Sequence, residues 1–265
     1  MQNFKQEIFK LWYLVRHYTL SAKAGGLVNI LTIFGSSIAL IAMIYVWKLG
    51  NASAAIFSYL LIGRIYKSLA ENYFVAKFSG DIISGQISQV LLLPTQVTRL
   101  YFFMMLGKRV FRNLIEFIGF SLATAFCVKF MSISIEYNFS TLWILALFLP
   151  IAFTINHFTG MIIGSLAFVI SDKRDFTGID NIYFNFRSIL AGWLIPLDLL
   201  PFSGFFTANP FAWQLHYPMQ IYLGKIYGWS ILWTWLQGLA WCVFLYFLAK
   251  IVFRKGLAFN ESNGL

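Results

Sequence analysis

Charged residues are scarce in this sequence. Asp, Glu, Lys and Arg make up only 11% of its 265 residues, whereas soluble domains usually carry about 25%. Hydrophobic residues account for 59% and aromatic residues for 19%, and the mean hydropathy is +0.72. This balance excludes a disordered chain and argues against an ordinary soluble globule. It indicates an integral membrane protein that crosses the bilayer several times.

Cysteine and histidine are also rare. Cys127 and Cys242 both lie in apolar stretches, without zinc-ligand or redox spacing, so we expect them to be small apolar packing residues. The 3 histidines show no metal-ligand spacing, and no metal or cofactor is expected on this chain. The polar residues 1–10 do not resemble the start of a cleaved signal peptide.

Long uncharged runs are the main feature of the sequence. A helix rises about 1.5 Å per residue, so about 20 apolar residues cross a membrane. The runs predict an all-α polytopic membrane protein with a single permease-like domain over 1–265. Its six predicted spans are residues 27–47, 53–72, 106–129, 142–169, 180–197 and 228–250.

The basic residues predict the orientation of these spans. The chain has 20 Lys and Arg against 10 Asp and Glu, a net charge of +10. All but Lys48, Lys129 and Lys225 fall on one side of the predicted spans or at its boundary, which predicts that both termini are cytoplasmic. The excess charge is therefore a sign of topology and not of a nucleic-acid partner. Arg187 is the least certain assignment, because it lies inside the fifth span and could snorkel to the surface.

Two segments outside the spans have helical apolar patterns. Residues 4–23, within an N-terminal segment 1–24, predict an amphipathic helix that lies in the membrane interface, packs against the spans, or does both. The cytoplasmic region 77–100 carries the apolar stripe Ile83, Ile87 and Leu91 and ends its helix at Pro94. It is either an ordinary juxtamembrane helix or one that docks on a partner.

The segment 198–225, between the last two spans, is apolar but broken. Pro196, Pro201, Pro210 and Pro218 forbid one continuous helix. Irregular backbone at membrane depth is tolerated only inside protein or beside a wet cavity. We therefore expect short external helices that dip back into the outer leaflet; the alternative is an aromatic belt on an ordinary loop.

Charges at the predicted span boundaries are a further candidate site. Arg64, Lys67 and Glu71 share one face at the inner end of the second span, and Arg112 and Glu116 form an i,i+4 pair in the third. Intramembrane charge is costly and often functional. The residues either snorkel and pair at the boundary or form a polar entrance or hinge for an anionic substrate.

Small and polar residues share the fourth span. Gly160 and Gly164 form a small-xxx-small patch that predicts close helix packing. Asn156 and His157 precede them and are expected either to be satisfied between helices or to line a pathway.

Two stretches resemble the type-2 ATP-binding-cassette exporter permeases. Residues 85–94 (Gly-Gln-Ile-Ser-Gln-Val-Leu-Leu-Leu-Pro) are similar to that family's Gly-x-Ile-Ser-x-x-Leu-Leu-x-Pro pattern. Residues 190–201, followed by Pro210, Phe211 and Pro218, resemble its Ser-Gly-x-x-Ile-Pro-Leu-x-x-x-Pro…Pro-Phe…Pro region, with Ala191 in place of the usual Ser. The layout agrees over almost the whole chain.

The resemblance implies a half-transporter in a bacterial-type inner membrane. Two permeases, identical or sister subunits, would form the pathway in the lipid bilayer, and a cytoplasmic ATPase dimer would drive it. Seven residues would contribute to a coupling helix on the ATPase: Gly80, Asp81, Ile83, Gly85, Ile87, Leu91 and Pro94. Six would contribute to an external gate: Gly192, Pro196, Pro201, Pro210, Phe211 and Pro218.

The chain lacks the motif of an ATPase. No Gly-x-x-x-x-Gly-Lys-Ser/Thr phosphate loop occurs in it, so ATP and Mg would be bound by the partner, and the chain is not expected to be an enzyme. Two alternatives stay open: an ion-coupled secondary transporter, or a membrane enzyme or assembly factor without an ATPase. The single proline-rich interruption argues against the secondary transporter, which often has two.

Overall fold

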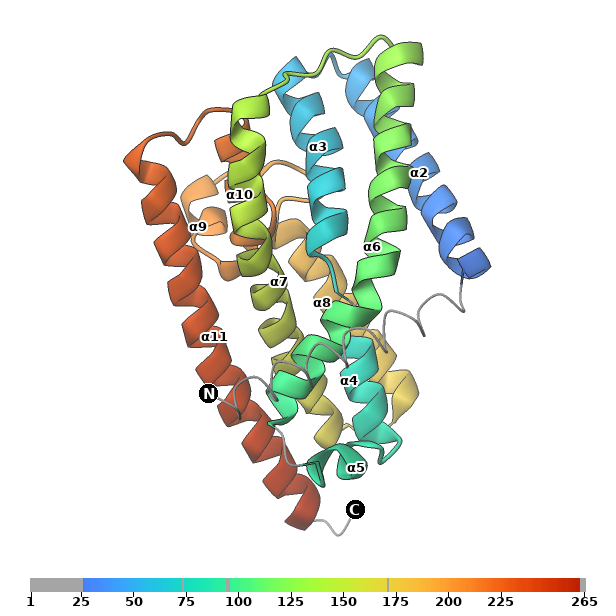
Figure 1. Ribbon diagram of the computed structural model, residues 1–265, viewed down its shortest axis with the longest axis vertical. Coiled ribbons are helices and arrows are strands. Elements are labelled where there is room, and N and C mark those ends of the chain that lie inside the picture. Colours follow the sequence, from blue (N-terminus) through green and yellow to red (C-terminus); the bar gives the residue numbers. More distant parts are fainter. Residues whose placement is uncertain (1–25, 73, 94–95, 171, 263–265) are drawn as a thin grey trace, which may run out of the picture.

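The computed structural model describes residues 26–72, 74–93, 96–170 and 172–262, and these form an all-helical bundle (Figure 1). The predicted helix over 4–23 and Pro94 lie outside the described residues. The longer helices are α2 (Gly26–Leu49), α3 (Ala54–Ala70), α4 (Phe74–Ile83), α6 (Val97–Phe130), α7 (Leu142–Gly164), α8 (Lys173–Leu190) and α11 (Trp229–Ser262). Short helical segments are α5 (Ile87–Leu91), η2 (Phe139–Thr141), η3 (Ser165–Phe168), η4 (Leu197–Leu199), α9 (Ser203–Thr207), η5 (Pro210–Gln214) and α10 (His216–Tyr222).

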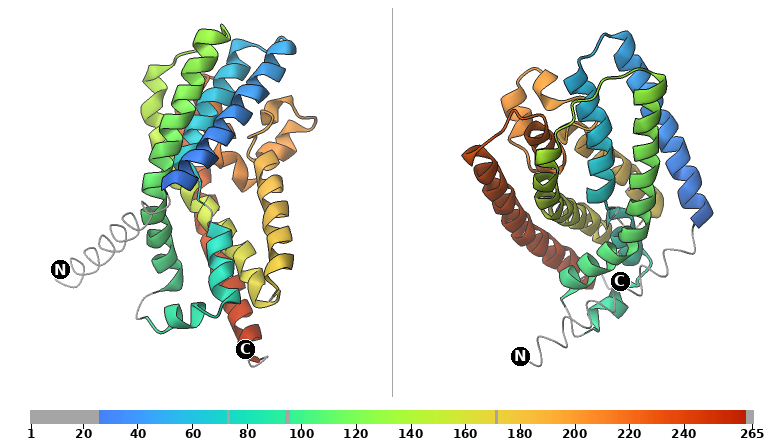
Figure 2. Two further views of the ribbon diagram at one scale, coloured as in Figure 1. Left: turned by 90° about the vertical axis from the view of Figure 1, so that its right-hand side faces the viewer. Right: turned by 45° about the horizontal axis from the view of Figure 1, so that its top comes forward.

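Three helical segments are long and apolar enough to cross a membrane: Arg112–Phe130, Phe139–Phe168 and Trp229–Phe259. A shorter apolar helix covers Ile33–Leu49. Figures 1 and 2 show α2, α3, α6, α7, α8 and α11 running alternately up and down the long axis. This arrangement is compatible with the predicted six spans, which stay a prediction.

The helix boundaries differ from the predicted spans in three places. Helix α6 begins nine residues before the predicted span 106–129, and α11 continues twelve residues beyond residue 250. Helix α8 already begins at Lys173 and ends at Leu190, so residues 191–197 are not helical as the span 180–197 requires. The chain turns there because Gly192 has a φ of +80°, outside the helical range.

Helix α7 is the centre of the bundle. It packs against α11, α4, α3, η5 and α10, while α2 and α3 pack against α6. Gly160 and Gly164 lie where α4 crosses α7: a Cβ on Gly160 would lie 3.1 Å from the Phe74 ring, and one on Gly164 would lie 2.8 Å from the Phe78 ring. The two glycines therefore allow this close crossing.

Helices α4 and α5 and the last turns of α11 lie together at one end of the long axis, called here the α5 end (Figure 1). Helix α3 runs toward this end, and its axis breaks before α4 at Glu71, which has extended backbone with ψ of 137°. The connections between α2 and α3 and between α6 and α7 lie at the opposite end.

Candidate functional site

A buried charge network lies beside the break between α3 and α4. The Arg187 guanidinium on α8 donates from Nη2 to Glu71 Oε1 at 2.7 Å, and Lys67 Nζ lies 3.5 Å from Glu71 Oε2. All three side chains are less than 10% exposed. The two cations also lie over the Trp193 ring, at 3.3 Å for Lys67 Nζ and 4.6 Å for Arg187 Cζ. One carboxylate thus holds two cations from different helices together.

Two asparagines join this network to α7. Arg187 Nη1 donates to Asn156 Oδ1, and Asn156 Nδ2 donates to the backbone carbonyl of Asn72 at 3.3 Å. Asn72 Nδ2 donates in turn to the Phe153 carbonyl at 3.4 Å. The bonds tie the helix break to α7 and α8, and Arg187 is therefore buried and paired, instead of snorkelling as its sequence position allowed. His157, the neighbour of Asn156, lies among aromatic rings and is 4.3 Å from the centroid of Phe74.

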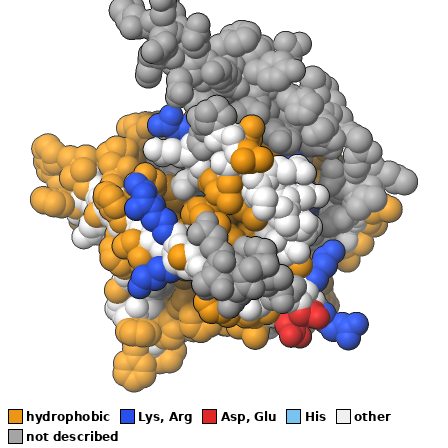
Figure 3. Space-filling model, turned by 90° about the horizontal axis from the view of Figure 1, so that it is seen from below, with side chains coloured by type: hydrophobic (Ala, Val, Ile, Leu, Met, Phe, Trp, Pro, Cys, Tyr) orange, Lys and Arg blue, Asp and Glu red, His pale blue; other side chains and the backbone are white. Residues whose placement is uncertain are grey.

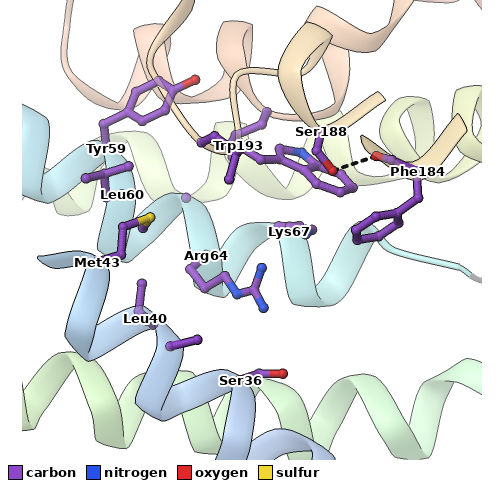
Figure 4. A pocket seen from close by; sticks show the side chains of 14 residues that line it. Ser36, Leu40, Met43, Tyr59, Leu60, Arg64, Lys67, Phe184, Ser188 and Trp193 are labelled. Atoms are coloured by element: carbon purple, nitrogen blue, oxygen red, sulfur yellow. Dashed lines mark hydrogen bonds between the residues drawn. The ribbon is translucent and has the colours of Figure 1, made fainter. Parts of the chain in front are cut away.

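A cavity opens on the other side of Lys67, between α2, α3 and α8 (Figure 4). Its volume is about 400 Å³, and its lining includes Leu40, Met43, Leu60 and Trp193. A second cavity of about 150 Å³ adjoins it toward the α5 end and is lined mainly by polar side chains. Four residues line both: Ser36, Arg64, Lys67 and Phe184.

The second cavity gathers all five charged residues singled out in the sequence. Arg112 Nε donates to Glu116 Oε1 at 2.8 Å, and both line it together with Arg64, Lys67 and Glu71. The Arg64 guanidinium lies 4.5 Å from the centroid of the Phe120 ring. Among the described side chains, no carboxylate lies within 4.0 Å of it.

The turn between α4 and α5 is exposed at the α5 end. Gly85, with a φ of +74°, makes the turn, and Leu91 and Leu92 are 38% and 86% exposed. A Cβ on Gly80 or Gly85 would meet no described atom within 4 Å. Figure 3 views this end and shows Lys and Arg side chains spread around it beside apolar ones.

The inner face of the same turn is packed against α6. Ile87 is 4% exposed and Ile83 is half-buried. Asp81, 6% exposed, accepts a hydrogen bond from Tyr101 Oη on α6 at 2.8 Å and pairs with Lys77. Of the residues predicted to couple to an ATPase, the structure places Asp81 and Ile87 inside and leaves Gly85 and Leu91 on the surface.

The segment after α8 folds back into the bundle. Gly192 packs against α3: its carbonyl accepts a hydrogen bond from Tyr59 Oη at 3.1 Å, and a Cβ would lie 2.5 Å from that oxygen. Pro196 and Pro218 are buried, Phe211 and Pro210 are half-buried, and Pro201 is exposed. The predicted gate residues therefore line one folded-back layer, although they do not converge on a single point.

An ion cluster closes this layer. Asp198 accepts from Gln220 Nε2 at 2.6 Å and from Lys225 Nζ at 2.9 Å, and its Oδ1 lies 3.6 Å from His216 Nε2. Burial of the imidazole lowers the pKa of His216 to about 4, although Asp198 acts in the opposite direction. His216 is therefore neutral at pH 7, and Asp198 is balanced by Lys225.

Comparison with known families explains this architecture. A model of the family described as "ABC-2 family transporter protein" matches residues 20–264. The chain belongs to this family. It is thus a multi-pass membrane component of an ABC transporter. No curated protein matches it significantly. The described residues of this ABC-2 chain contain no group of His, Cys, Asp and Glu that could hold a metal ion.

The ABC-2 chain brings together residues that its sequence could not connect. The Glu71–Arg187 contact joins positions 116 residues apart, and Asn72 and Trp193 were not singled out in advance. Two signals were present: Arg187 is a charge inside a predicted span, and Asn72 follows Glu71 at the helix break. Neither signal specified a partner.

Proposed function

We propose that this ABC-2 chain is the membrane-spanning permease of an ATP-driven exporter, driven by separate cytoplasmic ATPase subunits. The observation that carries the proposal is the family match over residues 20–264. The chain lacks a phosphate loop of its own, so ATP and Mg would be bound by the partner. Two permeases, identical or sister subunits, would enclose the pathway.

The α5 end is the proposed ATPase contact. Its exposed Gly85, Gln86 and Leu91 offer polar backbone and apolar side chains, while Asp81 and Ile87 anchor the turn from within. A partner groove could approach the backbone closely at Gly80 and Gly85, since neither carries a side chain. The basic residues on this side favour a cytoplasmic location, with both termini and the six-span topology as predicted.

The folded-back layer over 191–225 is the proposed external gate. It lies in the half of the molecule away from the α5 end, where its short helices cover α3, α7 and α11 (Figure 2). Gly192, Pro196, Pro201, Pro210, Phe211 and Pro218 would shape this gate.

Co-purification tests the proposal. The full-length chain is expressed with an ATPase encoded next to it, and a stable complex with ATPase activity is expected. Leu91→Glu places a charge on the exposed turn and should reduce the co-purified ATPase at least about tenfold, since a desolvated unpaired charge costs more than about 1.4 kcal/mol.

Ser134→Glu is the matched control, because it adds the same charge at an exposed position of the opposite end. It should retain the complex. A chain that purifies folded but never with an ATPase would contradict the proposal, and equal loss in both variants would remove the assigned contact.

A further inference from the structure

The two adjoining cavities form a continuous amphipathic space along α3. Leu60 lies in the apolar part, Arg64 and Lys67 line both parts, and Glu71 lies at the far end. From Leu60 to Glu71 the helix rises about 16 Å at about 1.5 Å per residue. The space thus changes from apolar to cationic within the length of a lipid-sized molecule, toward the α5 end.

Positive charge exceeds negative charge in the walls of this space. Arg64, Lys67 and the adjacent Arg187 share the single carboxylate Glu71, since Arg112 and Glu116 neutralise each other. Buried charge is stable only when it is paired. An anion between Arg64 and Lys67 would restore the balance.

Unpaired hydrogen-bond donors point to the same class of ligand. Trp193 Nε1 and Gln214 Nε2 are buried, and neither has an acceptor among the described residues. Both residues lie beside Lys67, and Trp193 also lines the larger cavity. Buried donors without partners are uncommon, and an oxyanion supplies acceptors without supplying further donors.

We propose that this space binds a phosphate-bearing amphiphile, with its phosphate between Arg64 and Lys67 and its acyl chain in the apolar cavity. A guanidinium matches phosphate oxygens in a bidentate fork, and a phosphate monoester carries about −1.5 to −2 charges at pH 7. The larger cavity, at about 400 Å³, lies in the range of roughly 300–1,000 Å³ typical of small-molecule sites.

The direction of the space matches one membrane leaflet. Its cationic part lies nearer the α5 end and its apolar part nearer the bundle middle, as head groups and chains are ordered in the leaflet on that side. Ala39 and Leu194 are exposed and line the apolar cavity, so it opens sideways between α2 and the segment after α8. An amphiphile would enter from the leaflet through this opening.

A binding titration on the full-length chain in neutral detergent tests the proposal without any ATPase. Melting temperature is followed against dioleoyl phosphatidic acid, against dioleoylglycerol with the same chains, and against inorganic phosphate. Only phosphatidic acid should give a saturable rise. Equal effects of dioleoylglycerol would show a merely apolar groove, and equal effects of inorganic phosphate a simple anion site; either result overturns the proposal.

Charge and shape variants locate the site. Arg64→Gln should weaken phosphatidic acid at least about tenfold, whereas Arg64→Lys should recover part of the affinity. Lys129→Gln removes an exposed cation outside the cavities and should leave binding unchanged. Ala39→Trp fills the apolar cavity from an exposed position without touching the charges, and it should weaken phosphatidic acid even if Arg64→Gln does not fold. Unchanged binding in Arg64→Gln, or in Ala39→Trp, would refute the assignment.

Discussion

The chain breaks twice between long helices, after α4 and after α8, and glycine has a different task in each break. At the first break, Gly80 and Gly85 face no described atom within 4 Å of a built Cβ. At the second, Gly192 is held against Tyr59, where a Cβ would lie 2.5 Å from the hydroxyl oxygen. The first break thus presents its backbone outward, and the second spends its backbone on contacts within the fold.

This difference separates a surface that a partner can use from one that the chain uses itself. The outward face of the α4–α5 turn tolerates substitution as far as the folded chain is concerned, so loss of function there would report a partner. Substitution around Gly192 changes the chain's own packing. Four substitutions, ordered by expected effect, test the contrast.

Gly192→Val should have the largest effect. A β-branched residue is strained at a φ of +80°, and its side chain would displace the Tyr59 hydroxyl. We expect a loss on the order of 3 kcal/mol or more in the free energy of unfolding. Size-exclusion chromatography and melting temperature in detergent measure it. Gly204→Val, in α9 of the same segment but with no described atom within 4 Å of its Cβ, should be far milder.

The second prediction concerns pH and the folded-back layer. The pKa of His216 is about 4 in the fold and about 6.5 when unfolded. Between these values the unfolded chain binds more protons, so stability is full above pH 6.5 and falls as pH decreases toward 4. From pH 7 to pH 5 the loss should be about 2 kcal/mol.

Melting curves of the wild type and His216→Gln at the two pH values isolate this contribution. The substitution should flatten the pH dependence, whereas a titration at the first break has no reason to change. An equally steep decline in His216→Gln would show that another group is responsible.

Tyr101→Phe tests the inner support of the first break. It removes the hydrogen bond from Tyr101 Oη to the buried Asp81 carboxylate, at a cost of about 1.5–3 kcal/mol, of which Lys77 offsets part. The melting temperature should fall. Tyr227→Phe, which alters an exposed tyrosine, is the control and should leave it unchanged. No decrease in Tyr101→Phe would mean that Lys77 alone holds Asp81.

Gly80→Ala should have the smallest effect, and of opposite sign. Ala is favoured over Gly inside a helix by roughly 0.5–1 kcal/mol, and its Cβ would meet no described atom within 4 Å. A slight increase in melting temperature is expected, alongside unchanged chromatography. A decrease would place Gly80 in a packed contact and weaken the contrast between the two breaks.

The sequence predicted local features of the fold better than contacts between distant segments. Helices α2 and α3 lie within two residues of the predicted spans 27–47 and 53–72, because uncharged runs end at turn residues there. The end of α8 was placed seven residues late, since the positive φ of Gly192 depends on its tertiary contact with Tyr59. The same limit applies to the stripe around Ile87, whose helical spacing cannot tell a partner's groove from the chain's own core.

The candidate site was predictable in part for the same reason. The i,i+4 spacing was enough to foresee the Arg112–Glu116 ion pair. The Glu71–Arg187 pair and the cavity beside Lys67 arise from three helices that meet only in the folded bundle, so no local pattern contains them.

The unequal construction of the two helices that flank the α4–α5 turn has a mechanical consequence. Helix α6 is continuous over 34 residues, about 50 Å, whereas α3 and α4 meet at a joint beside Glu71. A displacement of the turn would therefore travel along α6 as along a stiff rod to residues 131–138 at the other end. The same displacement would bend the α3–α4 joint, and the Glu71–Arg187 ion pair is the latch that resists this bending.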